Sequence, residues 1–138
     1  MIAAYGAWPS PVDAELVASG SRGYAELRGQ DDALFWLESR PDQAGRSTLT
    51  HWHEGVSREL IPAPFNARSR VHEYGGGAFC VADGRVYFVN FADQNIYGIR
   101  FDGDEVDAPW QVTEGDATER FADLVWEGTA IFAVRERH

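Results

Sequence analysis

Hydrophobic residues after Gly20 come in short runs, separated by Asp, Gly, Pro and Asn residues that favour turns. Three of these runs, residues 34–37, 86–89 and 130–134, are rich in aromatic and β-branched side chains. Each follows a turn signal, respectively Asp31-Asp32, Asp83-Gly84 and Glu127-Gly128. Short runs of this composition between turns predict β-strands rather than helices.

The three runs recur at a regular interval. They begin at residues 34, 86 and 130, so the spacing is 52 and then 44 residues, close to the roughly 40 to 50 residues of a propeller blade. Flanking runs recur in the same order and complete two four-stranded units and half of a third. They are residues 24–27, 78–81 and 121–125 before the turns, and 48–52, 58–61, 96–101 and 110–113 after the central runs. The pattern predicts an all-β fold, a partial β-propeller of about two and a half blades.

One short helix precedes the strands. Ser10 is a candidate cap, Pro11 suits the first helical position, Asp13 completes a capping box and Gly20 ends the helix. We divide the chain, residues 1–138, into four parts of one incomplete propeller domain. These parts are residues 1–20 with the helix, 21–65 as the first blade, 66–117 as the connector and second blade, and 118–138 as half of a third blade.

The blade count predicts an unfinished ring. Propellers close with about four to eight blades, and the last strand, residues 129–134, is apolar on both faces with no later strand to cover it. Uncovered strand edges pair with other molecules. We therefore expect self-association through the open blade edges.

Charge and composition narrow the classes of partner. The chain has 22 acidic and 12 basic residues and a net charge of -10, which argues against binding nucleic acid. The start resembles no signal peptide, and no run reaches the length of a membrane span. A single cysteine, Cys80, lies in an apolar run that resembles a buried strand. We expect a cytoplasmic protein without a membrane partner.

The sequence contains no catalytic constellation. A serine hydrolase of the α/β class needs Gly-x-Ser-x-Gly, whereas residues 19–23 place serines and glycines in another register, typical of a helix end followed by a loop. Gly75-Gly76-Gly77 lacks the Lys and Ser or Thr of a phosphate-binding loop. It predicts the start of a strand with close backbone approach.

A pair of histidines and an acidic stretch are candidate metal sites. His51 and His53 share one face of an expected strand, but no third ligand is evident, and the surface face of an outer strand is the simpler interpretation. Asp102, Asp104, Glu105 and Asp107 resemble half a calcium loop without its Gly, which favours a solvated hairpin turn. We expect no metal, no cofactor and no catalytic residue in this chain.

Residues 66–74 join two expected blades with more charged groups than a plain turn needs. In a functional interpretation this loop faces a substrate channel or a partner domain, with Arg70 ready for carboxylates and His72 paired with Glu73. In a structural interpretation it holds blade to blade, and Glu73 pairs with an arginine. The candidate channel or interface residues are Arg68, Arg70, His72, Glu73 and Tyr74.

Several longer motifs resemble the N-terminal region of prolyl-oligopeptidase-family (S9) serine peptidases, especially the acylaminoacyl-peptidase or dipeptidyl-aminopeptidase-like branch. They are residues 5–11, 36–41, 62–66, 69–77 and 86–88, and Asn90-Phe91-Ala92-Asp93-Gln94. The resemblance implies that a β-propeller precedes an α/β-hydrolase domain, which holds the catalytic Ser, Asp and His and is absent here. In such enzymes the propeller covers the active site and admits and positions short peptides.

Two hypotheses follow. The first is a non-catalytic propeller fragment of a serine oligopeptidase that gates and positions short peptides for the missing hydrolase domain. The alternative is a free-standing propeller-type interaction module that binds a protein partner or a small ligand. In either case we expect the chain alone to hydrolyse no peptide, because it lacks a nucleophile elbow and an ordered triad.

Overall fold

Three antiparallel sheets follow one another along the chain in the computed structural model, which describes residues 4, 6, 10–103 and 105–138. The first sheet has its strands in the spatial order in which they occur in the sequence. These strands are β1 (Tyr24–Gln30), β2 (Ala33–Arg40), β3 (Arg46–His53) and β4 (Val56–Glu59). Tight turns join neighbouring strands, so the sheet runs up and down as a propeller blade does.

The second sheet repeats this order with a divided outer strand. Its strands are β5 (Phe79–Ala82), β6 (Arg85–Val89), β7 (Ile96–Asp102), β8 (Glu105–Val106) and β9 (Trp110–Gln111). Both β8 and β9 pair with β7, so two short strands take the place of one fourth strand. The third sheet contains β10 (Glu119–Glu127) and β11 (Ala130–Arg137).

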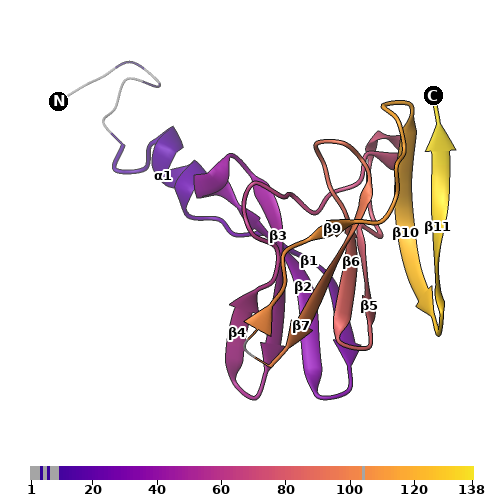
Figure 1. Ribbon diagram of the computed structural model, residues 1–138. Coiled ribbons are helices and arrows are strands. Elements are labelled where there is room, and N and C mark those ends of the chain that lie inside the picture. Colours follow the sequence, from indigo (N-terminus) through magenta and orange to yellow (C-terminus); the bar gives the residue numbers. More distant parts are fainter. Residues whose placement is uncertain (1–3, 5, 7–9, 104) are drawn as a thin grey trace.

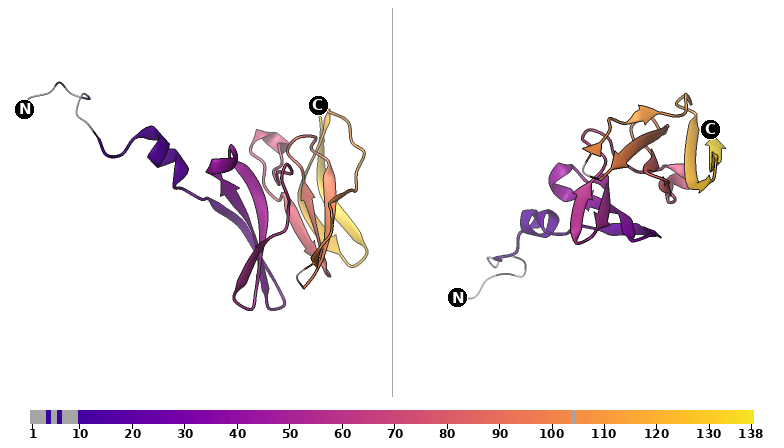
Figure 2. Two further views of the ribbon diagram at one scale, coloured as in Figure 1. Left: turned by 60° about the vertical axis from the view of Figure 1, so that its left-hand side comes forward. Right: turned by 60° about the horizontal axis from the view of Figure 1, so that its bottom comes forward.

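The three sheets are arranged along an arc (Figure 2). The β1–β2, β3–β4, β5–β6 and β10–β11 turns point to one end of the molecule. The β2–β3 and β6–β7 turns and the connections between sheets lie at the other end (Figure 1). The predicted partial propeller is therefore confirmed, with two blades of four or more strands and a two-stranded beginning of a third among the described residues.

Each expected strand overlaps an observed one, with two differences in detail. The strand expected at residues 58–61 is β4, two residues earlier, because Leu60 and Ile61 leave the sheet and insert into the core. The sequence analysis missed β8, which forms a hairpin with the end of β7 through the pair Asp102 and Glu105. That hairpin confirms the turn interpretation of the acidic stretch, although Asp104 lies outside the described residues.

The helix begins later than expected. Helix α1 (Ala14–Ser19) is capped by Asp13, whose Oδ1 accepts a hydrogen bond from the backbone N–H of Leu16 at 2.7 Å. Ser10 instead accepts from the N–H of Val12 at 3.1 Å in a local turn, so its expected role as the cap was wrong. Gly20 ends the helix as expected. Of the motif at residues 5–11, positions 5 and 7–9 lie outside the described residues.

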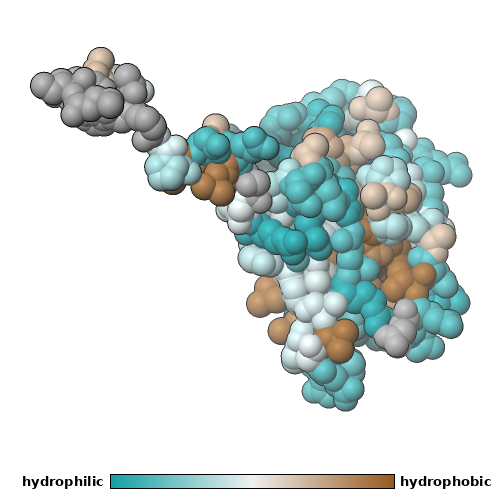
Figure 3. All heavy atoms as spheres, turned by 90° about the vertical axis from the view of Figure 1, so that its left-hand side faces the viewer, coloured by the Kyte–Doolittle hydropathy of each residue, from teal (hydrophilic) through white to brown (hydrophobic). Residues whose placement is uncertain are grey.

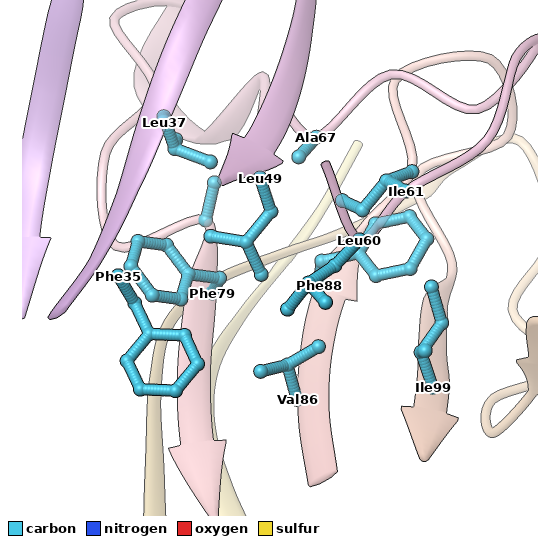
Figure 4. Close-up of a cluster of buried hydrophobic side chains, with 11 residues drawn as sticks. Phe35, Leu37, Leu49, Leu60, Ile61, Ala67, Phe79, Val86, Phe88 and Ile99 are labelled. Atoms are coloured by element: carbon cyan, nitrogen blue, oxygen red, sulfur yellow. The ribbon is translucent and has the colours of Figure 1, made fainter. Parts of the chain in front are cut away.

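Apolar side chains between the sheets form two cores. The first lies between sheets one and two (Figure 4), and the second lies between sheets two and three. Strand β6 contributes to both, since Val86 and Phe88 face the first sheet while Tyr87 and Val89 face the third. Strand β6, the expected run at residues 86–89, is therefore apolar on both faces. On the outer face shown in Figure 3, apolar residues are interspersed with hydrophilic ones.

Phe35, Tyr87 and Phe132 occupy the same register position in the second strands of the three sheets. Phe35 is 2% exposed and Tyr87 8% exposed, because each is covered by the following sheet. Phe132 is 59% exposed, because the described residues include no fourth sheet. On the opposite face of β11, Ile131 packs against the second core. The expected uncovered apolar strand is thus open on the face that carries Phe132.

The first strands of the sheets approach each other closely at Gly77. Its carbonyl oxygen accepts a hydrogen bond from the N–H of Leu124 on β10 at 3.1 Å. The Glu26 carboxylate of β1 accepts from the N–H of Ala78 at 3.0 Å, and burial raises the pKa of Glu26. A Cβ atom at Gly77 would lie 2.5 Å from the backbone N of Asp123. This arrangement confirms the prediction that the triple glycine permits close backbone approach.

We expect Gly77→Ala to lower the free energy of unfolding more than Gly55→Ala does. Both glycines have a positive φ, 55° and 84°, at which a Cβ costs roughly 1–2 kcal/mol. Only at Gly77 would the new methyl group also overlap the backbone of a neighbouring strand, since nothing lies within 4 Å of the Gly55 position. Urea unfolding of both variants measures the difference, and equal losses would contradict the close packing of the inner strands.

We expect the isolated chain to self-associate through the open face of β11. Phe132→Lys places a charge on that face and should weaken association at least about tenfold, or about 1.4 kcal/mol. Sedimentation velocity over a concentration series measures the effect. Val56→Lys is the matched control, because Val56 on β4 is also 59% exposed but lies away from β11. Equal effects of the two changes, or a wild-type monomer at all concentrations, would refute this prediction.

Candidate functional site

The loop that joins the first two sheets crosses the end of the molecule where the connections lie. We call residues 66–77 the connector loop. It begins beside the turn between β6 and β7: the N–H of Phe91 donates to the carbonyl of Asn66 at 2.8 Å, and the N–H of Arg68 donates to the carbonyl of Val89 at 3.0 Å. Backbone pairing therefore fixes the start of the loop on the second sheet.

Gln94 links the loop to the same turn through its side-chain amide. Its Oε1 accepts from the N–H of Arg70 at 2.7 Å, while its Nε2 donates to the carbonyl of Phe91 at 3.0 Å. Gln94 is itself buried. A buried side chain that satisfies backbone groups on both segments keeps their separation constant.

The two arginines of the loop stack on one aromatic ring. The guanidinium Cζ of Arg70 lies 4.1 Å from the centroid of the Phe91 ring, and that of Arg68 lies 5.1 Å from it. Both arginines are exposed. Stacking on a ring leaves the in-plane N–H donors of a guanidinium free to bind carboxylates or phosphates.

The middle of the loop is anchored to the third sheet. The Ser69 hydroxyl donates to the carbonyl of Phe121 on β10 at 2.6 Å and accepts from the N–H of Val71 at 3.1 Å. Ser69 and Val71 are both buried. The loop therefore contacts all three sheets in sequence and holds them together at this end.

His72 and Glu73 pair with residues of the third sheet, so the expected pairing of these two side chains with each other was wrong. Glu73 forms an ion pair with Arg120, and this hydrogen bond lowers the pKa of Glu73. His72 Nδ1 lies 3.2 Å from Glu136 Oε1. The chain turns sharply here, with positive φ values of 52° and 61° at His72 and Glu73, which separates the side chains. The Glu73–Arg120 pair agrees with the structural interpretation of the loop.

Tyr74 projects away from the protein and is 95% exposed. Together with Arg68 it lines a cleft of about 360 Å³ that also includes Glu26, Ser39 and Ser69. Gly75 must follow without a side chain, because a Cβ there would lie 2.7 Å from the carbonyl oxygen of Ser69. Arg68, Arg70 and Tyr74 thus present their side chains to solvent, whereas His72 lies against Glu136 and Glu73 is held by its ion pair with Arg120.

The other candidate chemistry lies elsewhere. His51 and His53 do share a face, with ring centroids 6.3 Å apart, but His51 also packs against Phe35 and Phe101. Within the described ranges, no group of three or more His, Cys, Asp or Glu side chains is placed to hold a metal ion. Cys80 is buried, and this burial raises the pKa of its thiol to about 11. A thiol with so high a pKa is a poor nucleophile at neutral pH.

Comparison with known proteins identifies the architecture. No family model and no curated protein matches the chain. Among solved structures, a puromycin-hydrolyzing peptidase of Mycobacterium tuberculosis matches 97% of the chain at 35% identity with a TM-score of 0.82. A puromycin hydrolase, solved also as an S511A mutant complexed with PGG, matches 91% at 36% identity with a TM-score of 0.78.

The chain is similar to the propeller region of the S9 serine peptidases. It spans 21% of the first of these peptidases and 20% of the second, or about a fifth of their length. The family resemblance drawn from the sequence motifs is confirmed. In the part of the chain that the structure describes, no helix is both long and apolar enough to cross a membrane.

Sequence reasoning missed the residues that hold the connector loop. Phe91 and Gln94 were noticed only as part of a family motif, and Arg120 and Glu136 were not singled out. The motif Asn90-Phe91-Ala92-Asp93-Gln94 was the available signal, because it combines an aromatic residue with an unusual number of amide and carboxylate groups in one turn. For Arg120 and Glu136 the sequence offered no signal, since their partners lie about 50 and 64 residues away.

We expect Ser69→Ala to destabilise the chain more than Arg70→Ala. Removing the Ser69 hydroxyl leaves a buried carbonyl and a buried N–H without their partner, which costs about 1–3 kcal/mol. Arg70→Ala removes an exposed ring contact worth about 0.5–1 kcal/mol. Urea unfolding measures both losses. The opposite order would show that the arginine, rather than the serine, anchors the loop.

Proposed function

We propose that this chain is a non-catalytic part of a serine oligopeptidase that gates and positions short peptides for a C-terminal α/β-hydrolase domain. The observation that carries this proposal is the match of nearly the whole chain to a fifth of two peptidases. A segment of this length supplies consecutive propeller blades and no nucleophile elbow. The chemistry therefore belongs to another part of the enzyme.

The positions of Arg68, Arg70 and Tyr74 support a role in contacting substrate or the hydrolase domain. Buried groups of the second and third sheets hold the backbone of the loop at Ser69 and Arg70, while the side chains of Arg68, Arg70 and Tyr74 remain exposed. A rigid loop with outward binding groups is the arrangement that recognition requires, since little conformational entropy is lost on binding. The two guanidinium groups suit a peptide carboxylate or an acidic residue of the partner domain.

The substrate class follows from the names of the neighbours. Both are named for hydrolysis of puromycin, and we extend this activity to the enzyme that contains the present chain. The acylaminoacyl-peptidase or dipeptidyl-aminopeptidase-like branch and a cytoplasmic location, both expected from the sequence, stay predictions.

The test is a chimaera in which this chain replaces the corresponding fifth of the Mycobacterium tuberculosis peptidase. The chimaera should hydrolyse puromycin and short peptides in preference to long ones. Arg70→Ala in the chimaera should change kcat/KM for short substrates by about tenfold, equivalent to about 1.4 kcal/mol, with a loss of stability no larger than the roughly 0.5–1 kcal/mol of the ring contact. Arg100→Ala, at an exposed arginine of β7, is the matched control and should leave kcat/KM unchanged.

Two outcomes would oppose the proposal. A folded chimaera that hydrolyses neither puromycin nor peptides would favour the alternative, a free-standing interaction module. A variant Arg70→Ala with unchanged kinetics and a lowered melting temperature would assign the loop a purely structural role.

A further inference from the structure

A second cleft lies between the first two sheets and is lined in part by the β1–β2, β3–β4 and β5–β6 turns. These turns lie at the end of the molecule opposite the connector loop (Figure 1). Its volume is about 650 Å³, within the roughly 300–1,000 Å³ typical of small-molecule sites. Residues of β2, β3 and β4 form one wall, and residues of β5 and β7 form the other. The proposed peptidase role does not use this cleft.

Three aromatic rings line the inner part of the cleft. The centroid of the Phe35 ring lies 4.8 Å from that of His51 and 5.7 Å from that of Phe101, and the rings of His51 and Phe101 are 5.2 Å apart. Phe35 stands at the end of the first core (Figure 4). Burial lowers the pKa of His51, so this ring is uncharged at neutral pH.

The next interface is packed by different side chains at equivalent positions. Between sheets two and three, Trp126 stacks on Tyr87 with ring centroids 5.8 Å apart and planes at 19°. The strand registers make Val81 the equivalent of Trp126 and Phe35 the equivalent of Tyr87. Val81 lines the cleft. A valine therefore stands where the following interface has an indole. Phe35 is nevertheless covered, because its partner across β3 is His51, whereas the partner of Tyr87 across β7 is Gly98. The open part of the cleft lies over the half-buried Val81, His51 and Phe101.

The rim of the cleft is acidic. Four carboxylates line it, those of Asp31, Asp32, Glu54 and Asp102, against the single guanidinium of Arg58. Arg58 donates a hydrogen bond to the carbonyl of Gly103 across the cleft. An acidic rim around an aromatic floor attracts a cation and repels an anion.

We propose that this cleft binds a small aromatic cation of the arylalkylamine class, with its planar ring against Val81, His51 and Phe101 and its ammonium group at the carboxylate rim. The cleft is large enough for one such molecule, and the rim supplies the charge that distinguishes an amine from a neutral aromatic compound. This site is separate from the connector loop, so the two proposals stand or fall independently.

Isothermal titration calorimetry on the intact chain tests the proposal with three probes. Tryptamine carries both the ring and the ammonium group, indole-3-ethanol lacks the charge, and n-butylamine lacks the ring. Tryptamine should bind, with at least about a tenfold advantage over each of the other two. Equal affinity for tryptamine and either partial probe, or no binding of tryptamine, would overturn the proposal.

Two variants locate the binding. Val81→Trp should fill the part of the cleft over His51 and Phe101 and abolish tryptamine binding. Asp31→Asn combined with Asp102→Asn keeps the shape of the rim, removes two charges and should weaken tryptamine binding about tenfold without affecting indole-3-ethanol. If Val81→Trp does not fold, the carboxylate variant decides. Arg70→Ala, in the connector loop, should leave tryptamine affinity unchanged. Undiminished affinity in both the folded Val81→Trp chain and the carboxylate variant would contradict the assignment.

Discussion

Packing of one sheet face against the next is the interaction on which the rest of this structure depends. A four-stranded antiparallel sheet has two faces, and neither the first nor the second sheet could bury its apolar side chains without a neighbour. The three equivalent aromatic residues make this dependence visible. Phe35 and Tyr87 are buried because another sheet follows, whereas Phe132, of the same character and in the same register, is exposed. Burial here is set by the neighbour and not by the residue type.

The polar contacts take their positions from this packing. Once the sheets lie face to face, their first strands come so close at Gly77 that no Cβ atom fits between the two backbones. The connector loop then spans three sheets and is held by small buried groups, the Ser69 hydroxyl and the Gln94 amide. These anchors leave Arg68, Arg70 and Tyr74 exposed. They place the candidate recognition groups at the end opposite the β1–β2, β5–β6 and β10–β11 turns. Differences in side-chain size at equivalent positions, such as Val81 and Trp126, decide whether an interface is filled or left open.

The strands and their order could be predicted from the sequence, because alternation, turn residues and a repeat near blade length are local or periodic signals. The exposed face of β11 followed from the same repeat. The helix cap was misassigned because Ser10 and Asp13 both satisfy the capping pattern, and only the backbone path selects Asp13. The pairing of His72 and Glu73 failed for a similar reason, since a positive φ at both residues turns neighbouring side chains toward distant partners. Contacts such as Glu73 with Arg120 depend on how sheets meet, which no local pattern encodes.

Amide hydrogen exchange of the intact chain measures the central claim most directly, because it reports the stability of each strand within one experiment. The second sheet is packed on both faces, so the amides of β6 should exchange most slowly. The amides of β2 and β3 should exchange faster than those of β6, and the amides of β11 should exchange fastest of these four strands. Slowest exchange in β10 and β11, or uniform protection of all three sheets, would contradict the claim that contact between neighbouring sheets holds this structure together.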